Sequence, residues 1–303
     1  MTATFRLISL AVLVLLVPPA WAQQGFPSPD AAAEALVQAL RASQRADQPD
    51  ELRLATMFGA DWREYVPVGS VGREDVDAFV ARYDEHHEFK ADPEGRQMLT
   101  VGKDAWTLPV PLAKVPGGGW TFDVEAAAPE IRARRIGRNE LEVEHAVLAY
   151  RDAQMDYATV DRDGDGVLEY AQKFLSTDGQ HDGLYWAEQP GQEESPLGPL
   201  FGDDTPDGEW HGYYYRILTA QGPSAPRGAY DYKLGDNMSR GFALIAWPVK
   251  YADTGVMSFM ISHDGDVFEK DLGAESEKKA MAMTLFDPDS SWNEVKETTA
   301  SAP

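Results

Sequence analysis

Apolar residues recur at helical spacing near the start of the chain and form short strand-like runs farther on. One amphipathic helix is predicted by "PSPDAAAEALVQALRASQ", with Ser28 or Asp30 as its cap. A second is predicted by "REDVDAFVARYDEHHEF". Strands are predicted by "QMLTVG", "AWTLPVPLAKV" and "GWTFDVE", with a turn at Gly117–Gly119. Helices followed by antiparallel strands predict an α+β domain over residues 27–136.

The second half repeats this order with one helix and more strands. A helix from about Glu140 to Ala158 is predicted by the four-three spacing of Val143, Val147, Tyr150, Gln154 and Tyr157. Asn139 and Glu142 have capping-box spacing. Four strands are predicted by "GYYYRIL", "GFALIAWPV", "GVMSFMIS" and "DVFEKDL", the last two joined by an "HDGD" hairpin turn. We therefore predict a second α+β domain over residues 137–295, with a helix packed on a four-stranded antiparallel sheet and a disordered tail over 296–303.

The first 22 residues have the pattern of a secretory signal. Arg6 precedes an apolar run over residues 7–17 that is too short to span a bilayer. Ala20-Trp21-Ala22 then places small residues where signal peptidase reads them. We expect cleavage after Ala22, export to the periplasm or the medium, and no membrane insertion of the mature chain. A buried core helix is the alternative interpretation.

The amino-acid composition excludes several kinds of site and partner. The sequence has no cysteine, which excludes disulfides, zinc–thiolate sites and thiol catalysis. Its formal net charge of −23 repels nucleic acids and anionic lipids and favours cations as ligands. We therefore expect no nucleic-acid partner.

Three resemblances follow from these segments. The layout of residues 27–136 resembles the cone-shaped domains of the nuclear-transport-factor-like superfamily. "WTLPVPL", "GGGWTFDVEAAAPEIRARRIGRNEL", "GYYYRILTAQGPSAPRGAYDYKL" and "GFALIAWPVKYADTGVMSFMISHDGDVFEKDLG" closely resemble the secreted bacterial proteins of the domain of unknown function 2950 family. The predicted helix with its "AYRDAQMDYA" end, and the late "TG…F.I…DG.V" hairpin, also look like the head of a type IV pilin or pseudopilin. Because the prepilin motif and the long apolar helix of pilins are missing, this last resemblance implies a fold and not assembly into a pilus.

The loop "DRDGDGVLEYAQ" has the acid spacing of an EF-hand calcium loop over its first nine positions. Position 12 is a glutamine where the loop of an EF-hand has a bidentate glutamate, and the loop precedes a helix-like "LEYAQKF". A hydrated acidic turn is the alternative. The candidate calcium ligands are the side chains of Asp161, Asp163, Asp165, Glu169 and Gln172 and the carbonyl of Val167.

A catalytic alternative rests on the nearby "STDGQHDGLYW". Asp165, Asp178, His181 and Asp182 could form an acid/base site of an envelope-modifying hydrolase. Turn chemistry alone also explains this segment. Trp186, Trp210, Trp247 and Trp292 could stack on a glycan, although aromatic residues at strand spacing are usually core residues.

Four arginines gather in "EIRARRIGRNE", inside an otherwise acidic chain. They are Arg132, Arg134, Arg135 and Arg138. We expect them to form ion pairs with acidic loops at the junction of the two domains; binding to an acidic partner is the alternative.

The leading hypothesis is an exported, non-enzymatic interaction or structural protein of the envelope, with calcium as a candidate cofactor. Its expected partner is an envelope or secreted protein, or a glycan.

The signal interpretation predicts that the exported protein begins at Gln23, because the small residues of Ala20-Trp21-Ala22 direct cleavage after Ala22. Mass spectrometry of the exported protein measures this end directly. An intact Met1, or a start at Phe26 or beyond, would contradict the interpretation.

Overall fold

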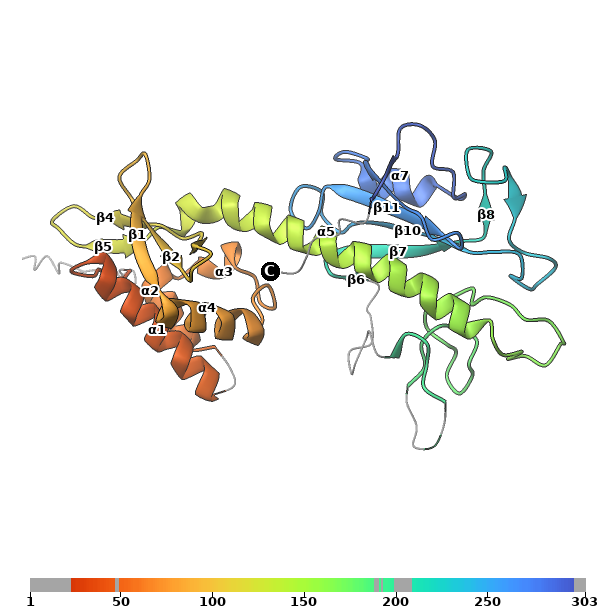
Figure 1. Cartoon of the computed structure of the whole chain (residues 1–303), viewed down its shortest axis with the longest axis horizontal. Coiled ribbons are helices and arrows are strands. Elements are labelled where there is room, and N and C mark those ends of the chain that lie inside the picture. The colour runs from red at the N-terminus through yellow and green to blue at the C-terminus, as the bar shows by residue number, and fades with distance from the viewer. Residues whose placement is uncertain (1–22, 47–48, 188–190, 192, 199–208, 297–303) are drawn as a thin grey trace, which may run out of the picture. The chain divides into compact units, whose positions relative to one another are not determined.

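A computed structural model describes residues 23–46, 49–187, 191, 193–198 and 209–296 (Figure 1). The predicted signal segment and the tail from residue 297 lie outside this range. The chain divides into two compact units, Met1–Ile131 and Arg132–Pro303. Each unit has a hydrophobic core of its own. None of the helices in the described ranges has an apolar stretch of membrane-spanning length.

In its described residues, the first unit combines four helices with a five-stranded antiparallel sheet. Its helices are α1 (Pro29–Ala46), α2 (Glu51–Phe58), α3 (Trp62–Tyr65) and α4 (Arg73–Glu85). Its strands are β1 (His87–Ala91), β2 (Gln97–Val101), β3 (Trp106–Thr107), β4 (Leu112–Lys114) and β5 (Trp120–Phe122). The sheet order is β1-β2-β4-β5, with β3 also paired to β2. The apolar face of α1 packs into this core, as its periodicity predicts.

The second predicted helix ends earlier than its pattern indicates. α4 stops at Glu85, and His87–Ala91 forms strand β1, paired residue by residue with β2. A tight turn closes this hairpin: Asp92 N donates to Arg96 O at 3.0 Å, and Gly95 has a φ of +81°. Strand pairing therefore overrides the helical periodicity at this position.

The second unit is built around a six-stranded antiparallel sheet. Two helices lie in its described residues: α5 (Val124–Tyr157), which begins in the first unit, and α7 (Ser276–Ala282). Its main strands are β7 (Tyr213–Leu218), β10 (Ala243–Pro248), β11 (Met257–Ser262) and β12 (Val267–Asp271). Two-residue strands, β6 (Glu209–Trp210) and β13 (Asn293–Glu294), form the edges, and β8 (Ala220–Gln221) pairs separately with β9 (Tyr230–Asp231). The four predicted strands and the α+β class are confirmed; the predicted sheet lacked its two short edge strands.

Both faces of this sheet are covered, which explains why all six residues of β10 are buried. Val147 and Tyr150 of α5 pack into the core on one face. On the other face, Arg216 of β7 donates to the carbonyls of Ala280 and Met281 in α7, at 2.7 and 2.8 Å. Figure 1 shows α5 and α7 on opposite sides of the strands. The predicted packing of the helix on the sheet is confirmed.

The start of this helix was predicted wrongly, and so was its capping box. α5 begins at Val124 and continues through Asn139 and Glu142 to Tyr157, one residue short of the predicted end. Alanine and arginine favour helix, and Gly137 costs only about 1 kcal/mol relative to alanine. Pro129 lies inside the helix, close to its start, where it removes one backbone donor without ending the helix. Instead of capping, the Asn139 side chain donates to Thr254 O at 2.8 Å.

The segment after the acidic loop is irregular, not helical as "LEYAQKF" indicated. Its backbone is bonded to other parts of the unit. The fully buried side chain of Gln154 accepts from Ala171 N at 2.8 Å and donates to Ala171 O at 2.9 Å. Tyr170 N donates to Met238 O at 2.8 Å. These bonds replace the ones that a helix would make.

Gln154→Leu should lower the free energy of unfolding by about 2–4 kcal/mol, because it leaves the buried N–H and C=O of Ala171 without their partner. Urea denaturation followed by tryptophan fluorescence measures the change. The exposed Gln180, in the same unit, provides the control: Gln180→Leu should change stability by less than about 0.5 kcal/mol. Equal effects of the two variants would contradict the role given to Gln154.

Candidate functional site: an acidic loop beside a polar pocket

The acidic loop begins where α5 ends, and Asp161 organises its backbone. Asp161 Oδ1 accepts from Gly164 N at 2.8 Å, and its Oδ2 accepts from Gly166 N at 2.9 Å. Both glycines have positive φ, of +78° and +89°, which other residues rarely adopt. The backbone bonds from Gly166 and Gly164 hold the pKa of the Asp161 carboxyl below its ordinary value.

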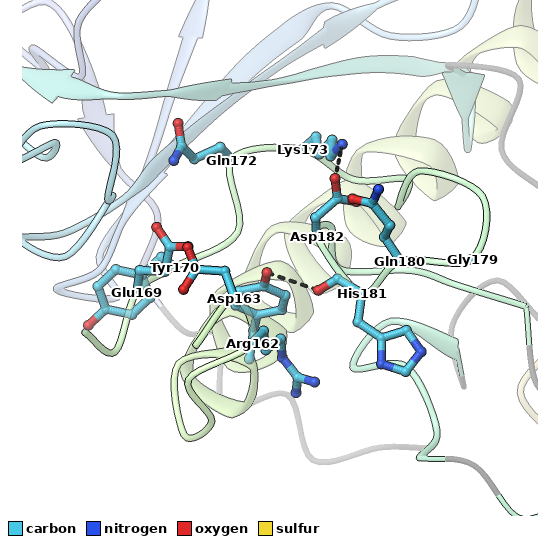
Figure 2. Close-up of a pocket in the computed structure, with 11 residues that line it drawn as sticks. Arg162, Asp163, Glu169, Tyr170, Gln172, Lys173, Gly179, Gln180, His181 and Asp182 are labelled. Atoms are coloured by element: carbon cyan, nitrogen blue, oxygen red, sulfur yellow. Dashed lines mark hydrogen bonds and ion pairs between the residues drawn. The ribbon is translucent and has the colours of Figure 1, made fainter. Parts of the chain in front are cut away.

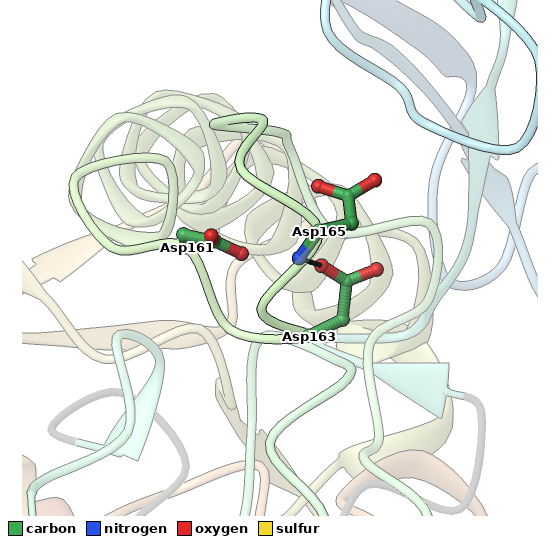
Figure 3. A group of neighbouring side chains, drawn as sticks. All are labelled: Asp161, Asp163 and Asp165. Carbon is green, nitrogen blue, oxygen red and sulfur yellow. Dashed lines mark hydrogen bonds between the residues drawn. The ribbon is translucent and has the colours of Figure 1, made fainter.

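Two more carboxylates lie close to Asp161 at the surface. Asp161, Asp163 and Asp165 each offer one oxygen, and these oxygens lie within 4.8 Å of one another. Figure 3 shows the three side chains on one turn, with the bond from Asp165 N to Asp163 Oδ1, at 3.2 Å. Asp165 Oδ1 accepts from Val167 N at 2.8 Å. Oxygens at this spacing repel one another and suit a hard cation such as Ca²⁺.

The two remaining candidate ligands are bonded to the turn that precedes β10. Glu169 Oε2 accepts from Met238 N at 3.3 Å, and Gln172 Nε2 donates to Asp236 O at 2.6 Å. The group of close carboxylates contains neither residue. Asn237 of the same turn donates to Asp165 Oδ2 at 2.6 Å. The structure thus brings three of the predicted side-chain ligands together and directs the other two toward residues 236–238.

The surroundings of Glu169 disfavour the ionised form of its carboxyl group. Desolvation by burial raises the pKa of the Glu169 carboxyl, and the negative charges of Asp163 and Asp165 raise it further. The bond from Met238 N acts in the opposite direction but does not cancel this rise. Glu169 is therefore the carboxyl of this loop that a cation or a proton would stabilise most.

Arg162 fixes the loop to the rest of the unit. Its guanidinium forms two hydrogen bonds with the carboxylate of Glu193, both at 3.0 Å. It also lies over the rings of Tyr157 and Trp186, at 4.8 and 5.0 Å from their centroids. Only 7% of the Arg162 side chain is exposed, whereas 51% of the Glu193 side chain is, so the pair joins a buried cation to an acid at the surface. The hydrogen bonds from Arg162 lower the pKa of the Glu193 carboxyl.

A pocket of about 810 Å³ lies beside the loop (Figure 2). Three segments line it: the end of α5, the loop with its extension, and the turn around residue 180. The lining residues include Tyr157, Arg162, Asp163, Glu169, Tyr170, Gln172, Lys173, Gln180, His181 and Asp182. Tyr157 closes one side, where its hydroxyl donates to His181 O at 3.1 Å and burial raises its pKa to about 12. Most of the other lining groups are polar.

The candidate catalytic residues do not form one acid/base group. Asp182 is bonded to Lys173 at 2.5 Å and to Thr177 N at 2.7 Å, whereas the ring of His181 stacks on Trp186 at 4.2 Å. Figure 2 shows the side chains of His181 and Asp182 pointing away from each other. Asp165 and Asp178 lie outside the pocket lining. Although desolvation raises the pKa of Asp182, the bonds from Lys173 and Thr177 outweigh it, and this pKa is lowered.

Two of the four clustered arginines pair with a single acid in the turn between β10 and β11. The guanidinium of Arg135 bonds the carboxylate of Asp253, and its Nε donates to Asp253 O at 3.2 Å. Arg132 Nε lies 3.7 Å from the same carboxylate. These pairs tie α5 to an acidic turn of its own unit and give the arginines a structural role.

Comparison with known proteins places the chain in a family. A family model described as "Protein of unknown function (DUF2950)" matches residues 23–295. The chain belongs to this family. No curated protein and no solved structure matches it. Membership covers both compact units, including the acidic loop and the pocket, and agrees with the expected family. The likenesses to nuclear-transport-factor-like domains and to pilin heads stay predictions.

Sequence reasoning missed several members of the pocket: Arg162, Tyr170, Lys173 and Gln180. None of them belongs to a motif with known spacing. Arg162 carried no signal of its own, because Asp161 and Asp163 beside it in the sequence already offer counter-charges. Its partner Glu193 lies 31 residues away, at a separation that sequence spacing does not reveal.

Glu169→Gln should raise the melting temperature by roughly 1–3 °C at pH 7.5 without calcium. A raised carboxyl pKa means that the ionised group destabilises the fold above its ordinary pKa, and this cost disappears as the pH falls below that value. The advantage of the variant should therefore shrink toward about pH 4. Thermal melts in chelator across this range measure it. The control is Glu294→Gln, at an exposed position of β13; an equal, pH-independent shift in both variants would contradict the argument.

Proposed function

We propose that this protein is an exported, non-enzymatic binding protein of the cell envelope, and that a calcium ion in the acidic loop stabilises its second unit. Membership in a family without an assigned activity is consistent with such a role and does not specify it. The signal-like pattern of residues 1–22 supports export, because an apolar run followed by Ala20-Trp21-Ala22 is what signal peptidase reads.

The observation that carries the calcium proposal is the convergence of Asp161, Asp163 and Asp165 within 4.8 Å. Nearby carboxylates cost free energy unless a cation, a proton or water screens them. Hard oxygen ligands at alternate positions before a glycine are the donor set that Ca²⁺ prefers. With three carboxylates and no bidentate twelfth ligand, the affinity should be that of extracellular modules, with a Kd on the order of 0.1–1 mM.

The orientation of the second candidate cluster favours binding over catalysis. An acid/base pair requires His181 and Asp182 within hydrogen-bond reach of each other or of a common substrate atom. Asp182 is occupied by Lys173 and Thr177, and His181 is stacked on Trp186. The hydrolase hypothesis would need both side chains to turn away from these partners, so we retain the binding role.

Calcium at about 10 mM should stabilise the folded protein by about 1.4–2.7 kcal/mol, because a ligand that binds only the folded state stabilises it by mass action. For a unit of this size, the melting temperature should rise by roughly 3–10 °C. Differential scanning calorimetry in calcium and in chelator measures the shift. Asp163→Ala should abolish it, since this substitution removes one of the three convergent carboxylates.

Asp178→Asn provides the matched control, because Asp178 is an exposed aspartate in a neighbouring turn that does not belong to the convergent group. This variant should respond to calcium as the unmodified protein does. If calcium leaves the melting curve of the unmodified protein unmoved, the acidic loop is a hydrated turn and the calcium proposal fails. A shift that persists in Asp163→Ala would place the ion elsewhere.

A further inference from the structure

The two basic side chains that line the pocket beside the acidic loop are already paired with acids. Arg162 is paired with Glu193 through two hydrogen bonds, and Lys173 is paired with Asp182 at 2.5 Å. A phosphate or carboxylate ligand would have to displace one of these acids to gain a counter-charge. The described lining therefore disfavours anionic ligands, although it contains two basic side chains.

The hydrogen-bonding groups that remain in the pocket are mixed acceptors and donors. Gln172 uses its amide nitrogen on Asp236 O, which leaves its carbonyl oxygen as an acceptor. Asp163 and Glu169 each have further acceptor capacity beyond their single backbone bond. Gln180 offers an exposed amide with both a donor and an acceptor end. A hydroxyl group can donate to some of these groups and accept from others.

The pocket also offers aromatic surface. Tyr170 lines it and is only half-buried, with its ring held edge-on against Phe242 at 4.7 Å. Aromatic rings present a flat apolar surface to the C–H groups of a ligand, while nearby polar side chains fix its orientation. The volume of about 810 Å³ lies within the range of small-ligand sites.

We propose that this pocket binds a short neutral saccharide, which names the envelope component of the proposed function and rests on that function. A saccharide combines many hydroxyl groups with apolar C–H faces, and so matches the free groups of the pocket better than an anion does. Asp163 belongs both to the pocket lining and to the convergent carboxylates. A calcium ion at the loop would neutralise these acids, and a neutral ligand then requires no further counter-charge.

Isothermal titration of the whole protein with chitotriose, cellotriose and maltotriose, in calcium-containing buffer, tests this inference. At least one trisaccharide should bind at up to millimolar concentration. Gln180→Ala and Glu169→Gln should each weaken that binding by about tenfold, the loss that corresponds to about 1.4 kcal/mol. Asp178→Asn, next to the pocket but outside its lining, should bind like the unmodified protein.

The outcomes separate this inference from the proposed function. If calcium raises the melting temperature but none of the three trisaccharides binds, the saccharide inference is overturned and the calcium role stands. If a trisaccharide binds with the expected dependence on Gln180 while calcium has no effect, the inference stands and the calcium role fails. Binding of the polyamine spermidine in place of the sugars, weakened by Glu169→Gln, would overturn it by identifying a site for cations.

Discussion

The buried amide of Gln154 connects the regular part of the second unit to its irregular part. It pairs with both backbone groups of Ala171 and also donates to the hydroxyl of Tyr150, at 2.9 Å. A buried polar group must be bonded, so Gln154 can be accommodated in the core only when Ala171 lies against α5. The acidic loop lies between these two residues, and the pocket lies around the same segment. The position of both features thus depends on this pairing.

The acidic loop and the pocket lie side by side because Gln154 and Ala171 are held together. With residues 154 and 171 held together, the intervening chain must turn back sharply, and Gly164 and Gly166 with positive φ permit the turn. Arg162 then points inward to Glu193 and the two aromatic rings, while its neighbours Asp161 and Asp163 offer their oxygens to one surface. An ion bound there would neutralise carboxylates that otherwise repel one another, without requiring any change in the core.

The sequence predicted those features that depend on residues close together in the chain. The main strands and the apolar face of α5 were identified correctly. Burial on one face imposes a helical period on α5, and each of these strands is a short apolar and aromatic run bounded by turn residues. The acidic loop was located, since three aspartates and two glycines act within one turn. Contacts between distant residues could not be read in this way: Gln154 was assigned to a helix face, but its bond to Ala171 and the pairing of Arg162 with Glu193 have no sequence signature. For the same reason "LEYAQKF" was taken for a helix.

Gln154 holds the irregular segment around Ala171 as firmly as regular secondary structure would. Amide hydrogen exchange at Ala171, measured by NMR, tests it most directly, because the Ala171 N–H is bonded only 2.8 Å from Gln154 Oε1 in a buried position. We expect slow exchange at Ala171, comparable with buried residues of α5 such as Val147, and fast exchange at the exposed Gly179. Exchange at Ala171 as fast as at Gly179 would show that Gln154 does not hold this segment in place.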